Sequence, residues 1–191
     1  MRYNIICAGT GGQGVVTAAR ILADAAVGRG YVIRQSEVHG MARRGGSVSV
    51  QLRIADATIE SDLIPRGTAH LIIGMEPLEG LRFLPWLEPD GAVVVSLDEV
   101  NDFPGYPTVD YLVRELGRVP RSVTVHARKE ASAAEAPRAA NMLLLGIASR
   151  IIPMLRGAAF EDSIREHFRE KGEDEIRANL RAFAAGIERT V

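Results

Sequence analysis

Two short segments of this chain combine residue types that can bind an anion. The first is the glycine-rich run from Gly9 to Gly14, and the second is the stretch from Ser36 to Gly46, which contains acidic, imidazole and guanidinium side chains. Glycines allow a tight turn in which backbone N–H groups approach a ligand closely. Arginine donates two parallel hydrogen bonds to a carboxylate or a phosphate. Both segments therefore predict contacts with a negatively charged ligand, provided that the fold brings them to one side.

The glycine-rich run lies between a strand-like segment and a helical one. Residues 3–8 are mainly apolar, and residues 15–27 carry apolar side chains at helical spacing. The spacing of Gly9, Gly11 and Gly14 fits the dinucleotide-binding fingerprint, in which the last glycine permits close packing of the helix. We therefore predict a cofactor-binding turn made of Gly9, Gly11, Gly12, Gln13 and Gly14. A turn that only lets the strand and the helix pack closely remains the alternative.

The stretch from Ser36 to Gly46 is predicted to be a loop that follows a second strand beginning at Tyr31. In an open α/β sheet, the carboxyl ends of parallel strands share one edge, which is the edge that the glycine-rich turn occupies. The candidate ligand-facing residues of this loop are Glu37, His39, Arg43, Arg44, Gly45 and Gly46. A structural histidine and a solvated arginine pair remain the alternatives.

Length and composition are those of a single globular domain covering residues 1–191. The chain has 23 Lys and Arg residues against 24 Asp and Glu residues, a formal net charge of -1, so composition predicts no nucleic-acid partner. Cys7 is the only cysteine, which excludes an internal disulfide and a cysteine-ligated iron–sulfur cluster on this chain alone, and we predict no metal site. No segment has the pattern of a signal peptide or a membrane span, so we expect a cytoplasmic protein without a membrane partner.

Strand-like and helix-like segments alternate along the chain. Residues 47–54 alternate apolar with polar side chains and predict an antiparallel strand, whereas 69–74 and 91–96 are apolar runs typical of central parallel strands. Leucines at every third position from Leu78 to Leu87 indicate a crossover helix that begins at Pro77. A strand is expected over 122–126, and helices that cover the sheet are expected after Arg138. The predicted fold is α/β, a Rossmann-like doubly wound, mostly parallel sheet with a helical C-terminal region.

A dinucleotide-binding enzyme of this fold needs an acidic residue at the end of the second strand, about twenty residues after the glycines. Arg34 and Gln35 occupy that position, and Glu37 is the nearest acid. Arg34 is instead suited to a ribose phosphate, and no recognisable catalytic constellation accompanies the turn. A free-standing NAD(P)- or FAD-binding reductase and a non-enzymatic nucleotide-binding module therefore stay open as alternatives.

Four motifs together give the chain a resemblance to a known family. They are the glycine-rich run, Ser36-Glu37-Val38-His39-Gly40-Met41 with Arg44-Gly45-Gly46-Ser47-Val48, Glu76-Pro77-Leu78-Glu79, and Asn141-Met142 with Leu145-Gly146. Over nearly its whole length the chain resembles the small (beta or gamma) subunits of the 2-oxoacid:ferredoxin oxidoreductases. The segment from Ser36 to Met41 favours the indolepyruvate branch, although Arg43 stands where a glutamine is more usual.

The resemblance implies a complex of two subunits with different roles. It places thiamine diphosphate, Mg²⁺ and [4Fe-4S] clusters on a large (alpha) subunit, where a 2-oxoacid such as indolepyruvate or another arylpyruvate is oxidatively decarboxylated to an acyl-CoA and electrons pass to ferredoxin. Coenzyme A (CoA) is then a co-substrate. The small subunit is expected to carry no catalytic residue of its own, to bind no cofactor alone and to be inactive by itself. Residues 36–46 are expected to face the substrate, CoA or the large subunit.

Overall fold

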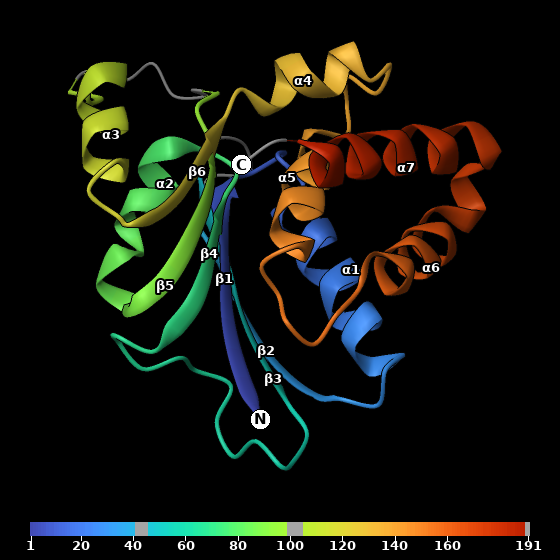
Figure 1. The fold of residues 1–191 in the computed structure, drawn as a ribbon, viewed down its shortest axis with the longest axis horizontal. Helices are drawn as coiled ribbons and strands as arrows, with labels where there is room; N and C mark the ends of the chain where they lie inside the picture. The colour runs from blue at the N-terminus through green and yellow to red at the C-terminus, as the bar shows by residue number, and fades with distance from the viewer. Residues whose placement is uncertain (41–45, 99–104, 190–191) are drawn as a thin grey trace.

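A six-stranded sheet forms the centre of the computed structural model, which describes residues 1–40, 46–98 and 105–189 (Figure 1). The strands, in the order of the sheet, are β2 (Val32–His39), β3 (Ser47–Ala55), β1 (Arg2–Thr10), β4 (Ala69–Gly74), β5 (Leu87–Ser96) and β6 (Arg121–Val125). The helices are α1 (Val15–Val27), α2 (Pro77–Arg82), α3 (Val109–Leu116), α4 (Ala127–Ala133), α5 (Ala140–Ser149), α6 (Gly157–Phe168) and α7 (Glu173–Glu188). Two 3-10 helices, η1 (Leu84–Trp86) and η2 (Arg169–Lys171), lie between them.

Strand β3 runs against its neighbours. It pairs antiparallel with both β1 and β2, whereas β1, β4, β5 and β6 pair in parallel. Because β2 is antiparallel to β3, it points the same way as β1 although the two are not adjacent. These pairings confirm the mostly parallel sheet and the antiparallel strand expected over residues 47–54. They also bring the carboxyl ends of β1, β2, β4, β5 and β6 to one edge of the sheet, which we call the carboxyl edge.

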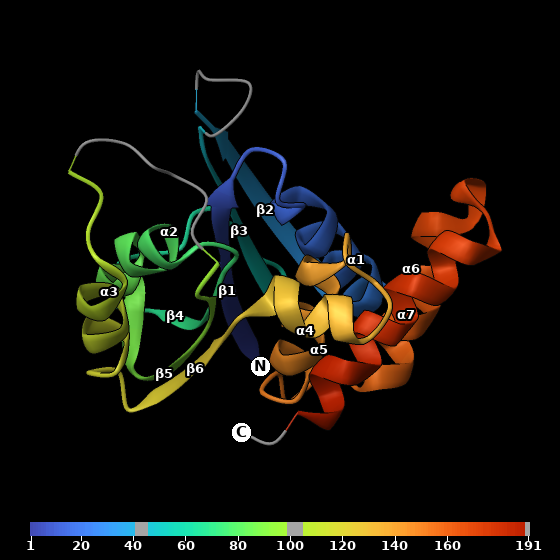
Figure 2. The same cartoon turned by 90° about the horizontal axis from the view of Figure 1, so that it is seen from above.

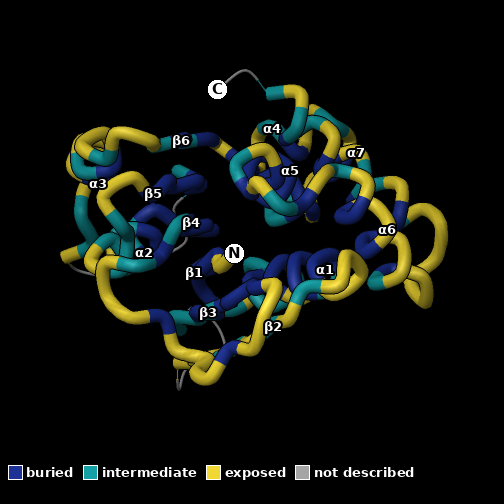
Figure 3. The backbone as a smooth tube through the Cα atoms, turned by 60° about the horizontal axis from the view of Figure 1, so that its bottom comes forward, coloured by how far each residue is buried: buried dark blue, intermediate teal, exposed yellow. Residues whose placement is uncertain are grey.

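Helices lie on both faces of the sheet (Figures 1 and 2). On one face, strand residues such as Ile5 and Cys7 pack in one core with α1, α5, α6 and α7. On the other face, Ile6 and Ile72 pack with the segment from α2 to η1 and with α3. Alternate residues of a strand point to opposite faces, so β1 contributes to both cores. Figure 3 shows that burial is concentrated in the central strands and in α1 and α5. This arrangement confirms the doubly wound α/β fold.

Helices α5 and α7 approach each other so closely that their backbones touch. A Cβ atom on Gly146 would lie 2.1 Å from the carbonyl oxygen of Phe183, and one on Gly186 would lie 2.1 Å from that of Leu143. Only glycine fits at either position. This contact holds α7 against α5, which is buried from Met142 to Ser149 between the sheet and the outer helices. No helix in the described parts of the chain is long and apolar enough to cross a membrane.

Two segments differ from the sequence prediction. The leucine-rich segment from Leu78 to Leu87 is not one helix: α2 ends at Arg82, η1 follows, and Leu87 already begins β5. Pro85 explains the break, because proline lacks an N–H group and disfavours helical backbone at the residue before it. Residues 36–39 are not loop but the last part of β2, where they pair with β3. The sequence did not indicate this part of the strand, because its side chains are mostly polar. Pairing with β3 depends on backbone hydrogen bonds and does not require apolar side chains.

Candidate functional site

The glycine-rich turn joins β1 to α1 at the carboxyl edge. Gly12 and Gly14 have φ angles of 99° and 76°, a left-handed conformation that favours glycine. Gly9 has no room for a side chain, because a Cβ atom there would lie 2.8 Å from atoms of Gln13, Val15 and Met75. The amide of Gly11 donates to the carbonyl oxygen of Gly46 at 2.9 Å, so the turn is tied to the residue that precedes β3. The glycines of the motif are therefore required by the backbone conformation of the turn and by its close contacts.

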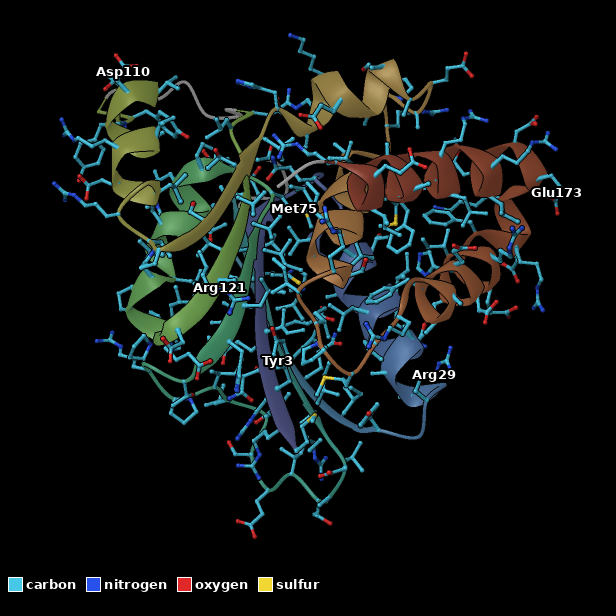
Figure 4. The ribbon with its side chains drawn as sticks, in the orientation of Figure 1. Tyr3, Arg29, Met75, Asp110, Arg121 and Glu173 are labelled. Atoms are coloured by element: carbon cyan, nitrogen blue, oxygen red, sulfur yellow. The ribbon has the colours of Figure 1, made fainter. Side chains whose placement is uncertain are left out.

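Gln13 holds this turn with its side chain. Its Oε1 atom accepts a hydrogen bond from the amide of Thr10 at 2.7 Å, and its Nε2 atom donates to the carbonyl oxygen of Met75 at 2.9 Å. Met75 follows β4 at the same edge of the sheet, where Figure 4 labels it. Both polar atoms of the Gln13 amide group thus bond to backbone. The structure thus gives the Gln13 side chain a role in fixing the turn, and its part in cofactor binding stays a prediction.

Helix α5 packs against the other end of the turn through Asn141. The Nδ2 atom of Asn141 donates to the carbonyl oxygen of Gly14 at 3.3 Å. A Cβ atom on Gly14 would lie 2.4 Å from that same nitrogen. The close helix packing expected at Gly14 is therefore present, and its partner is a residue 127 positions further along the chain.

A pocket of about 380 Å³ opens beside the turn, between the carboxyl edge and the segment from α4 to α5. We call it the edge pocket. Its polar lining comes from the turn itself and from side chains on β5, α4 and α5 or next to them: Gly11, Gly12, Gln13, Ser96, Asp98, Arg128, Arg138 and Asn141. Met75 and Leu144 contribute apolar surface. A pocket with apolar walls and a few convergent polar groups is the usual form of a small-molecule site.

Asp98 is the acidic group of the edge pocket, and its orientation is fixed. Its Oδ2 atom accepts from the hydroxyl of Ser96 at 2.8 Å and from the amide of Arg128, at the start of α4, at 2.6 Å. The His126 Nδ1 atom lies 3.9 Å from the Oδ1 atom. A carboxylate held in this way can accept hydrogen bonds from ligand hydroxyl groups, while the guanidinium groups of Arg128 and Arg138 suit anionic groups. None of these residues was predicted from the sequence as part of a site.

The predicted residues of the stretch from Ser36 to Gly46 separate into three groups. Glu37 and His39 form a pair at the end of β2, with His39 Nε2 3.1 Å from Glu37 Oε2, and Gln35 donates to the other carboxylate oxygen at 2.5 Å. Neither residue of the pair lines the edge pocket. Gly46 does reach the glycine-rich turn, through its carbonyl oxygen. Arg43, Arg44 and Gly45 lie outside the described residues.

Two other sequence expectations concern the chemistry of single residues. Burial raises the pKa of the Cys7 thiol to about 12, so this cysteine is a protonated core residue and not a nucleophile. Arg34 donates from Nε to the carbonyl oxygen of Ile59 at 3.2 Å, in the loop after β3, and does not line the edge pocket. Its contact with a ribose phosphate stays a prediction. In the described ranges, no group of three or more His, Cys, Asp or Glu side chains is placed to hold a metal ion.

A glycine-rich turn and a pocket at the carboxyl edge of a doubly wound sheet define a Rossmann-like α/β protein. The family model described as pyruvate ferredoxin/flavodoxin oxidoreductase matches residues 4–189, and the chain belongs to this family. Indolepyruvate oxidoreductase subunit IorB of Archaeoglobus fulgidus is 35% identical over an alignment that covers 100% of this chain and 96% of the relative. The resemblance inferred from the motifs is thus confirmed.

Two solved structures share the fold. Pyruvate oxidoreductase subunit PORC from Thermotoga maritima superposes with a TM-score of 0.74 at 24% identity, covering 98% of this chain and 96% of that one. The 2-oxoglutarate:ferredoxin oxidoreductase from Magnetococcus marinus, solved with 2-oxoglutarate, coenzyme A and succinyl-CoA bound, superposes with a TM-score of 0.76 at 18% identity. This chain corresponds to 30% of that longer chain, which carries the same fold as one of its parts.

Proposed function

We propose that this protein is the small subunit of an indolepyruvate-type 2-oxoacid:ferredoxin oxidoreductase and has no turnover by itself. The observation that carries the proposal is the match over nearly the full length of both chains to a relative named as a subunit of such an enzyme. The residues agree with it, because one buried cysteine cannot ligate a [4Fe-4S] cluster. The proposal assigns the clusters, thiamine diphosphate and Mg²⁺ to the large subunit, and makes ferredoxin the electron acceptor of a cytoplasmic complex.

We also propose that the small subunit contributes a binding surface for CoA. The edge pocket offers three kinds of group that a nucleotide with phosphates and ribose hydroxyls needs. The backbone N–H group of Gly12 in the glycine-rich turn and the guanidinium of Arg138 suit the phosphates, whereas Asp98 suits the hydroxyls. When bound, CoA supplies the thiol that accepts the acyl group, and this chain binds and orients its anionic end. Residues 36–46, with His39, Arg43 and Arg44, are proposed to face the large subunit and the substrate.

Reconstitution with the large subunit tests the first part of the proposal. The purified small subunit should be colourless and inactive with indolepyruvate and an electron acceptor, and CoA-dependent oxidation should appear when the large subunit is added. Turnover by the small subunit alone would contradict the proposal. Titration of the isolated chain with NADH, NADPH, FAD and CoA separates the remaining alternatives, since tight binding of a dinucleotide would favour a free-standing reductase or a nucleotide-binding module.

Arginine variants in the reconstituted complex test which surface meets an anion. Arg138→Ala should raise the KM for CoA about ten- to a hundredfold, because a charge-assisted hydrogen bond contributes about 1.5 to 3 kcal/mol. Arg44→Ala tests the 36–46 segment in the same assay, with CoA and the 2-oxoacid varied separately. Arg29→Ala is the matched control, because Arg29 is exposed after the far end of α1, where Figure 4 labels it. Unchanged constants in Arg138→Ala would remove the edge pocket from CoA binding.

A further inference from the structure

Helix α2 begins with two buried carboxylates. Glu76 is fully buried and the exposed fraction of Glu79 is 3%, although both lie at the carboxyl edge of the sheet. A carboxylate is stable in such a place only when its oxygens accept hydrogen bonds. The edge pocket lies on the α5 side of the sheet, whereas α2 covers the opposite face. The role assigned to the edge pocket does not account for these two acids.

Glu79 is connected to the glycine-rich turn through β3. Its Oε2 atom accepts from the hydroxyl of Ser47, the first residue of β3, at 2.6 Å, and its Oε1 atom lies 3.4 Å from Nε of Arg82. The residue before Ser47 is Gly46, whose carbonyl oxygen accepts the amide of Gly11 at 2.9 Å. Ser47, which donates to Glu79, is thus the direct neighbour in sequence of Gly46, which accepts the hydrogen bond of the Gly11 amide. Figure 2 shows the end of β2, the start of β3 and the β1–α1 turn at the same edge of the sheet.

Glu76 fixes the helix from which Glu79 reaches. Its Oε2 atom accepts from the amide of Glu79 at 2.8 Å and so caps α2, while its Oε1 atom accepts from the hydroxyl of Tyr106. The preceding residue, Met75, accepts from Gln13. The corner between β4 and α2 therefore holds the turn at two points, directly through Gln13 and indirectly through Glu79.

We propose that Glu79 is a positioning residue for the glycine-rich turn: through Ser47 and Gly46 it sets the place of the Gly11 amide at the wall of the edge pocket. A charged acceptor makes a shorter and stronger hydrogen bond than a neutral one, which favours a carboxylate over an amide here. The position of the turn depends in this way on a side chain from the opposite face of the sheet. That this position matters for CoA rests on the function proposed above.

Hydrogen exchange at the Gly11 amide in the full chain, followed by NMR, tests the proposal without any ligand. Ser47→Ala should speed this exchange about tenfold or more relative to that of the Cys7 amide in the middle of β1, and Glu79→Gln should speed it less. Ser47→Thr keeps the hydroxyl and should restore slow exchange. Thr10→Val is the matched control, because Thr10 is the cross-strand partner of Ser47 and its buried hydroxyl has no hydrogen-bond partner among the described residues.

The reconstituted complex supplies the second measurement. Ser47→Ala should raise the KM for CoA while leaving kcat within about a factor of two, because the turn binds CoA and takes no part in the chemistry. Unchanged exchange at Gly11 in both Ser47→Ala and Glu79→Gln would overturn the positioning role. Faster exchange at Gly11 with an unchanged KM for CoA would support the positioning role and instead overturn the assignment of CoA to the edge pocket.

Discussion

Replacing Gly14 by alanine should impose two separate penalties on the turn. The first is conformational, because Gly14 has a φ of 76° and a left-handed alanine costs about 1–2 kcal/mol. The second is steric, because the new Cβ atom would lie 2.4 Å from Nδ2 of Asn141 and overpacking of this kind costs about 1–3 kcal/mol. We therefore expect Gly14→Ala to lower the free energy of unfolding by about 2–5 kcal/mol.

A double-mutant cycle can separate the two penalties. Asn141→Ala removes the clashing side chain at a cost of about 1 kcal/mol for its lost hydrogen bond to Gly14. In that background, Gly14→Ala should cost only the conformational penalty of about 1–2 kcal/mol, which gives a coupling energy of about 1–3 kcal/mol. Gly30→Ala provides the reference, because Gly30 has a φ of 83° and nothing within 4 Å of its Cβ position.

Urea unfolding of the full-length variants, monitored by circular dichroism, measures all of these free energies. An equal cost of Gly14→Ala with Asn141 and without it would contradict the contact between the turn and α5. A harmless Gly14→Ala beside a destabilising Gly30→Ala would contradict the left-handed conformation of Gly14.

Two further outcomes follow from buried contacts. Gly146→Ala should lower the free energy of unfolding by about 2 kcal/mol or more, because its Cβ atom would clash with the carbonyl oxygen of Phe183. Gly157→Ala is the control and should cost nothing, because the nearest neighbour of its Cβ atom is 3.4 Å away. Equal losses in urea titrations would contradict the contact between α5 and α7. Burial raises the pKa of Glu76, so its contribution to stability is present below its ordinary pKa and is lost as pH rises through the folded-state value. Thermal unfolding measured from below the ordinary pKa of Glu76 to above its folded-state pKa should therefore show a fall in the Tm of the wild type that Glu76→Gln lacks. Parallel curves of Tm against pH for the two proteins would contradict this expectation.

Local signals in the sequence were enough to predict the elements that carry the turn. Glycines bound α1 at both ends and its apolar residues have helical spacing, so the helix from Val15 to Val27 was predicted with the bounds that the structure shows. The antiparallel strand β3 was predicted for a similar reason, because its apolar and polar residues alternate. The prediction was wrong where a single residue or a tertiary partner determines the secondary structure. Pro85 ends the expected crossover helix, and pairing with β3 makes a strand of the polar segment that contains Glu37 and His39.

The edge pocket could not be predicted, because its parts come from distant segments of the chain. Gly14 and Asn141 both belong to motifs that mark the family, yet nothing local to either residue indicates that they touch. Asp98 follows a buried strand at the carboxyl edge, a position at which an acid is a usable signal, whereas the dinucleotide fingerprint places the expected acid after the second strand. The commitment of Gln13 to backbone atoms likewise needs the position of Met75.

The insertion of β3 between β1 and β2 changes which groups can reach a ligand held at the turn. In a dinucleotide-binding sheet, the strand beside the first one ends in the acid that holds a ribose. Here the neighbour of β1 is antiparallel, so it brings its beginning, Gly46 and Ser47, to the turn. The end of β2, with Glu37, lies two strand spacings from β1, about 10 Å across the sheet. Among the described residues, the acid at the end of β2 is therefore set apart from an adenosine bound at the turn in the dinucleotide manner, whereas the acid that lines the pocket beside the turn is Asp98, which follows β5 on the other side of β1.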